Sequence, residues 1–154
     1  MIALFKETPE TDGFDALERK MVRALSLHKE MKRLLEEEME AGQKFDSHTL
    51  TKLTLMKNNC VNRFEYLVGA IRDQLRRMAP EELPNTCPRT LANRVHAIPG
   101  LTLDWEERLL PLARELEAEN RALIEASRRN IAMLRGVMDR MWAVYQYTRH
   151  GGPV

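Results

Sequence analysis

Residues 104–149 read DWEERLLPLARELEAENRALIEASRRNIAMLRGVMDRMWAVYQYTR. Apolar residues recur in this stretch mostly at steps of three or four, which places them on one helical face. Asp104 is the expected N-cap, Glu107 would complete a capping box, and Pro111 predicts a kink near the start. The stretch therefore predicts one long C-terminal helix. Its apolar positions are Trp105, Leu109, Leu112, Leu116, Leu123, Ile124, Ile131, Leu134, Met138, Met141 and Tyr145.

A second amphipathic helix is expected from Phe14 to Glu40. Its apolar steps also alternate between three and four, and Gly42 is expected to end it. Three consecutive glutamates, 36–38, crowd like charge near its end. The stripe consists of Phe14, Leu17, Met21, Ala24, His28, Met31, Leu35 and Met39.

A third helix is expected to start at an Asp46 cap and to stop at Pro80. Phe45 and Leu50 flank the cap with the spacing of a hydrophobic staple. The link to the preceding helix is short, so the two helices should pack as an antiparallel hairpin. The stripe of this helix is Leu53, Met56, Cys60, Phe64, Leu67, Ile71, Leu75 and Met78.

Four prolines in residues 79–103 indicate a connector. Within it, 88–98 predicts a short helix with Pro88 in its first turn and Leu91, Val95 and Ile98 on one face. The fold class is therefore all-α: a hairpin, a short helix and a long C-terminal helix. Residues 1–13 contain breaker signals and are expected to form a flexible arm, with 14–154 as a single helical domain.

Composition narrows the functional class. The chain has 154 residues, 31% of them charged, yet its net charge is only +1, which argues against a general nucleic-acid or membrane-surface binder. Cys60 and Cys87 form no CxxC motif and fit a reducing compartment. No window has the apolar length of a membrane span, and the protein is expected to be cytoplasmic.

No pattern predicts catalysis, a metal site or a cofactor. The four histidines, at 28, 48, 96 and 150, lack the spacing of a zinc or di-iron site. No phosphate-binding loop or nucleophile elbow is present. His28 lies on an apolar stripe, so a structural histidine is the expected interpretation. We therefore expect a protein that is not an enzyme.

The end of the long helix is the candidate binding surface. A helix of this length outreaches its partners, so part of it should lack an intramolecular neighbour. Methionine, tryptophan and tyrosine suit a surface that accepts another helix, although ordinary core is the alternative. Arginine dominates from residue 128 onward, where a solvated face is the alternative. The predicted partner-binding residues are Leu123, Ile124, Ile131, Leu134, Met138, Met141, Trp142 and Tyr145.

Two stretches give the sequence a resemblance to the FlgN family of flagellar type III export chaperones. The first is LEEEMEAGQKFDSHTL at 35–50, followed by Leu53 and Lys57. It is similar to the family's acidic helix end, short turn and second helix. The second is LEAENRALIE at 116–125, followed by Asn130 and Leu134. It resembles the opening of the family's substrate-binding C-terminal helix.

The resemblance implies a cytoplasmic chaperone. Such proteins bind the C-terminal helical regions of hook–filament junction proteins, prevent their premature assembly and deliver them to the export apparatus. Two alternatives remain open: a structural or regulatory coiled-coil protein that forms oligomers through its long helix, and a helical bundle that holds an unrecognised cofactor.

Overall fold

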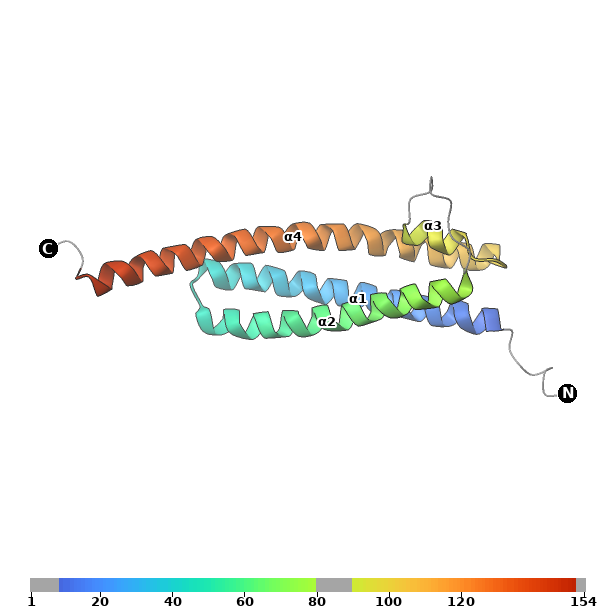
Figure 1. Ribbon diagram of the computed structural model, residues 1–154, viewed down its shortest axis with the longest axis horizontal. Coiled ribbons are helices and arrows are strands. Elements are labelled where there is room, and N and C mark those ends of the chain that lie inside the picture. The colour runs from blue at the N-terminus through green and yellow to red at the C-terminus, as the bar shows by residue number, and fades with distance from the viewer. Residues whose placement is uncertain (1–8, 80–89, 152–154) are drawn as a thin grey trace. The chain divides into compact units, whose positions relative to one another are not determined.

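The computed structural model describes residues 9–79 and 90–151, and side chains from residue 13 onward. These residues form four helices and no strand (Figure 1), which confirms the all-α prediction. The helices are α1 (Pro9–Gln43), α2 (Ser47–Met78), α3 (Leu91–His96) and α4 (Leu103–Arg149).

The contacts divide the chain into two compact units. The first comprises the described parts of 1–29 and 62–121, and the second comprises those of 30–61 and 122–154. Each of the three long helices contributes a segment to both units.

Helix α1 begins earlier than the sequence pattern predicts. Pro9 is its first residue, so 9–13 are helical and not part of an arm; residues 1–8 lie outside the described structure. Proline suits a first helical position because its missing N–H would have no intrahelical partner there. Gly13 lies within the helix and leaves space for Met78, since a Cβ at this position would come within 3.3 Å of the Met78 methyl group. This glycine therefore permits close packing against α2 and does not interrupt α1.

The turn between α1 and α2 differs from the prediction in one residue. Gly42 does not end α1, which continues to Gln43; the left-handed residue is Phe45, with φ of 55°. The Phe45 N–H donates to the Gly42 carbonyl and the Asp46 N–H donates to the Ala41 carbonyl, which is the Schellman pattern. The predicted Asp46 cap is confirmed, because its carboxylate accepts from the Thr49 N–H at 3.1 Å.

The starts of α3 and α4 also correct the sequence prediction. Thr90 caps α3 and accepts from the Asn93 N–H at 3.1 Å, while Pro88 lies outside the described residues. Thr102, not Asp104, lies at the cap of α4, where its hydroxyl accepts from the Trp105 N–H at 3.4 Å. The proposed Asp104–Glu107 capping box is therefore wrong. Helix α4 continues through Pro111 without interruption.

The first unit has an apolar core made by α1, α2, α3 and the first part of α4. Leu17, Met21, Val95 and Leu109 have no exposed surface, and Leu75 is only 1% exposed. These side chains come from the stripes that the sequence predicts, so the helix faces were assigned correctly there. The core also contains Phe14, Ala24, Leu25, Ile71, Ile98, Ala113 and Leu116.

The second unit holds the α1–α2 turn and the last part of α4. The buried side chains of α4 here are Leu123, Asn130 and Val137, spaced seven residues apart. At the next step of the series, Val144 is 62% exposed. In Figure 1, α4 continues past the turn between α1 and α2, so its burial stops where the neighbouring helices stop. The other buried apolar residues of this unit are Met31, Leu34, Leu35, Ala41, Leu53 and Cys60.

Candidate functional site

The predicted partner-binding residues fall into two groups. Leu123 is buried at 7% exposure and Leu134 is half-buried, so these two belong at least partly to the core of the second unit. The other six have between 45% and 68% of their surface exposed. They are Ile124, Ile131, Met138, Met141, Trp142 and Tyr145.

This exposed apolar surface follows from the length of α4. Residues from Met138 to Arg149 are exposed, apart from a half-buried Gln146, because the turn of the hairpin is reached before α4 ends. The centroid of the Phe45 ring in that turn lies 5.6 Å from the Arg140 guanidinium, which marks the level at which α1 ends and α2 begins. The nine residues beyond Arg140 extend about 14 Å at 1.5 Å per residue.

Two aromatic rings give this end of α4 a defined shape. Trp142 and Tyr145 are stacked, with ring centroids 5.4 Å apart and planes inclined by 26°. Val144 and Tyr147, at 62% and 57% exposure, add apolar surface that the sequence analysis did not select. Tryptophan and tyrosine are among the residue types that contribute most to binding at protein interfaces. The sequence feature that could have identified Val144 and Tyr147 is their position beyond the end of the α1–α2 hairpin.

A buried polar network connects the three helices of the second unit. Glu38 on α1 has no exposed side-chain surface, and its carboxylate lies 2.9 Å from the Lys57 ammonium on α2. Asn130 on α4 is 2% exposed; its amide donates to Glu38 at 3.3 Å and to the Leu35 carbonyl at 2.9 Å. Because each polar group requires its partner, we expect the network to hold the three segments in one register.

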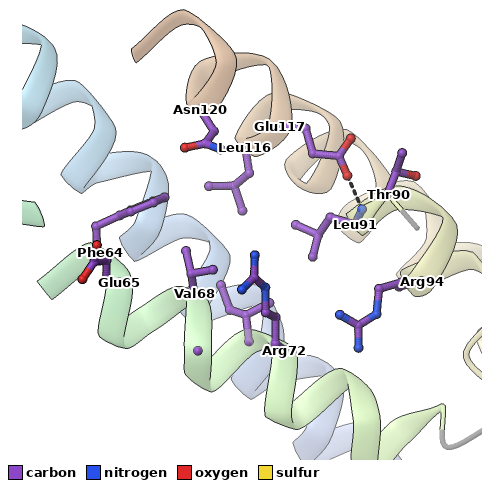
Figure 2. Close-up of a pocket in the computed structure, with 12 residues that line it drawn as sticks. Phe64, Glu65, Val68, Arg72, Thr90, Leu91, Arg94, Leu116, Glu117 and Asn120 are labelled. Carbon is purple, nitrogen blue, oxygen red and sulfur yellow. Dashed lines mark hydrogen bonds between the residues drawn. The ribbon is translucent and has the colours of Figure 1, made fainter. Parts of the chain in front are cut away.

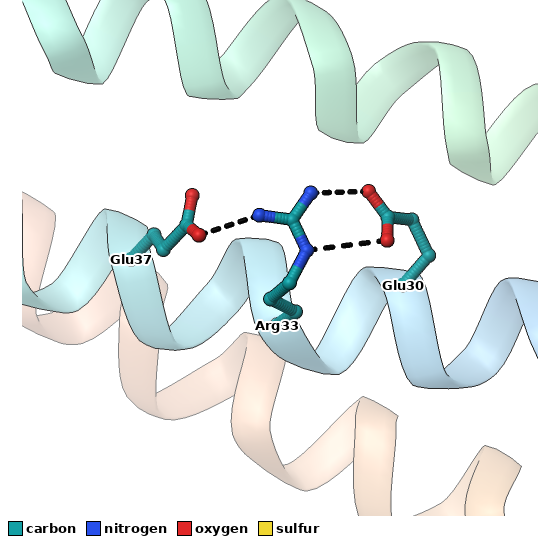
Figure 3. A network of polar contacts seen from close by, with 3 residues as sticks. All are labelled: Glu30, Arg33 and Glu37. Carbon is teal, nitrogen blue, oxygen red and sulfur yellow. Dashed lines mark hydrogen bonds and ion pairs between the residues drawn. The ribbon is translucent and has the colours of Figure 1, made fainter.

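The three consecutive glutamates have different environments. Glu36 is exposed, Glu38 is buried in the network just described, and Glu37 accepts a hydrogen bond from Arg33 (Figure 3). Arg33 also pairs with Glu30, and these hydrogen bonds lower the pKa of Glu30 and raise that of Arg33. All three members of this surface network lie on α1 with helical spacing, so it is interpreted as a helix-stabilising feature.

A groove in the first unit has a volume of about 630 Å³ (Figure 2). The Glu117 carboxylate on α4 accepts from the backbone N–H groups of Leu91 and Ala92, so it serves to cap α3. The remaining lining combines apolar side chains with the charged side chains of Arg72, Arg94 and Glu65 and the polar side chains of Thr90 and Asn120. The groove is lined by Phe64, Glu65, Val68, Gly69, Ile71, Arg72, Thr90, Leu91, Arg94, Leu116, Glu117 and Asn120.

His28 is fully buried, as the structural interpretation requires. Its ring meets Phe64 edge-on with centroids 4.2 Å apart, and neither ring nitrogen has a hydrogen-bond partner among the described residues. Burial lowers the pKa of His28 from its ordinary value of 6.5, and the opposing effect of the Glu119 charge is smaller. The folded protein therefore favours the neutral form of this imidazole.

We expect this buried histidine to make the free energy of unfolding depend on pH. Below about pH 6.5 the unfolded chain binds a proton at His28 more readily than the folded chain does, so the free energy of unfolding falls as pH falls. The slope has an upper limit of about 1.4 kcal/mol per pH unit, which is the value for one whole proton. Denaturant unfolding of the wild type and of His28→Leu between pH 7.5 and 5.5 measures it. The variant should lose less stability over this range, whereas His48→Leu, at an exposed position, should follow the wild type. Equal slopes for wild type and His28→Leu would contradict the prediction.

No group of three or more histidine, cysteine, aspartate or glutamate side chains in the described chain could hold a metal ion. None of the described helices has the length and apolarity needed to cross a bilayer. Comparison with known proteins found no matching family model, no similar curated protein and no similar solved structure.

Proposed function

We propose that the protein is a cytoplasmic export chaperone of the FlgN type. It binds the C-terminal helical regions of hook–filament junction proteins through the last part of α4 and releases them to the export apparatus. The observation that carries this proposal is the exposed apolar face of α4 beyond the end of the α1–α2 hairpin. The bound client would cover this face and be kept from premature assembly.

Two further features support a binding protein of this kind. The exposed face belongs to a continuous helix whose inner side is anchored by Leu123, Asn130 and Val137, so the surface is held in place before a client arrives. The buried Glu38 and Asn130 and the half-buried Lys57 lie in, or shortly after, the stretches that resemble the family. Ordering of the client helix on binding would offset part of the interaction energy and keep the complex releasable.

Removal of residues 138–154 should leave a folded protein that no longer binds the client. The cut follows Val137, which is 3% exposed, so the buried side of α4 is retained. Calorimetry against the C-terminal helical region of a hook–filament junction protein measures binding, and circular dichroism measures folding. We expect the shortened chain to keep its helical circular dichroism spectrum and its unfolding transition. We expect the heat of client binding to disappear.

Two results would contradict the proposal. Undiminished binding by the shortened, folded chain would place the client elsewhere, and no binding by the full chain would reject the client class. A full chain that forms a tight oligomer at every concentration, and loses it on truncation, would favour the coiled-coil oligomer instead. Size measurement over a range of concentrations separates these cases.

A further inference from the structure

The exposed face of α4 has a repeat of its own. Ile124, Ile131, Met138 and Tyr145 are spaced seven residues apart, and Ser127, Leu134 and Met141 lie between them. The steps alternate strictly between three and four residues, which is the pattern of a left-handed coiled-coil seam. We call these seven residues the outer seam. Five of them are between 45% and 68% exposed, and Ser127 and Leu134 are half-buried.

The outer seam is separate from the face that packs inside the protein. Leu123, Asn130 and Val137 are at most 7% exposed, and each directly precedes a residue of the outer seam. One edge of the seam is therefore already covered by the protein's own helices. A partner helix would approach from the opposite edge.

Arginine lines that opposite edge. Arg128 directly follows Ser127 of the outer seam, and Arg135 directly follows Leu134. At the same spacing of seven residues, the next residues on this edge are Trp142 and Arg149. All four are exposed, and the three arginines form no ion pair among the described residues. Between residues 126 and 151 the chain has one acidic residue, Asp139. In coiled coils, charges at such flanking positions select the partner.

We propose that the outer seam binds an amphipathic helix whose apolar stripe is flanked by glutamate or aspartate. The inference rests on the proposed chaperone function and adds the chemistry of the client helix. Acidic flanks would meet Arg128, Arg135 and Arg149 and form pairs at the rim of the interface, which favours the correct partner and accelerates association.

A second copy of this chain fits the seam poorly. In an antiparallel pair the arginine row of one copy would face the same row of the other, and like charges repel. In a parallel pair the arginines would face the edge occupied by Asn130 and Val137, which is buried within each protein. Charge complementarity therefore selects a helix of a different, acidic composition.

Two designed peptides provide the test. Both contain four heptads with isoleucine and leucine at the seam positions; one carries glutamate and the other lysine at the flanking positions. Calorimetry with the full chain should give about tenfold tighter binding of the glutamate peptide, since each rim pair contributes a few-fold. Arg128→Glu combined with Arg135→Glu should reverse this preference. Arg129→Glu combined with Arg140→Glu changes the net charge equally but lies off the seam, and it should preserve the preference.

Three outcomes would overturn the inference. The first is equal binding, or no binding, of the two peptides. The second is self-association that the glutamate peptide cannot displace. The third is binding to vesicles containing anionic phospholipid that is tighter than binding to either peptide, which would assign the arginines to a lipid surface.

The same variants separate this inference from the proposed function. If the junction-protein region binds and the Arg128→Glu, Arg135→Glu double variant leaves its affinity unchanged, the acidic-flank inference fails and the chaperone function stands. If that region does not bind but the glutamate peptide shows the expected preference and reversal, the function fails and the seam chemistry stands.

Discussion

Glu38→Ala is expected to lower the free energy of unfolding by about 3–5 kcal/mol. The Glu38 carboxylate is fully buried and lies 2.9 Å from the Lys57 ammonium. Its removal leaves a mostly buried positive charge without its partner and deprives the Asn130 amide of one acceptor. An uncompensated buried charge costs far more than the contact it loses. Urea unfolding at pH 7, followed by circular dichroism, measures the change.

Two further variants make this result specific. Glu36→Ala changes an exposed glutamate on the same helix and should cost less than about 0.5 kcal/mol. Glu38→Leu combined with Lys57→Met removes both charges, and it should recover most of the stability lost in Glu38→Ala because no unpaired charge remains. If Glu38→Ala and Glu36→Ala cost the same, the network contributes little and its proposed effect on helix register is wrong.

Most helix faces could be predicted because they depend on local spacing. Leu17, Met21 and Leu75 lie in the core as the three-and-four spacing requires. The helix ends were less predictable because competing signals occur there. Pro9 and Gly13 read as breakers in the sequence, yet Pro9 fits a first turn and Gly13 gives room to Met78. Thr102 and Asp104 are both good caps, and only the backbone geometry selects Thr102.

The candidate site was only partly predictable for a related reason. A single stripe was expected on α4, but the structure has two adjacent stripes, one buried and one exposed. Leu123 and Ile124 are neighbours in the chain and look equivalent in composition, and tertiary contact alone assigns Leu123 to the inside. Asn130 illustrates the same limit: a polar residue breaks an apolar pattern, yet it is 2% exposed because Glu38 and the Leu35 carbonyl accept its hydrogen bonds.

Met138→Asp combined with Met141→Asp is expected to weaken binding of the client region about 100-fold or more, equivalent to about 2.7 kcal/mol. Both methionines are exposed, at 68% and 46%, so the free protein should tolerate the new charges. In the complex the same carboxylates would be transferred from water into an apolar interface, and that transfer carries a large penalty. Calorimetry against the C-terminal helical region of a hook–filament junction protein measures the affinity, and thermal unfolding of the free variant measures the fold.

Ala132→Asp combined with Ala143→Asp supplies the matched control. Both alanines are exposed on α4 and lie outside the outer seam, so this variant adds the same charge to the same helix. Its affinity should remain within a few-fold of the wild type, because its carboxylates stay in water when the client binds. A similar loss in both variants would show that net charge, and not the apolar seam, controls binding. Full affinity in the Met138, Met141 variant would place the client on another surface, since two charges within a desolvated contact cannot be neutral in free energy.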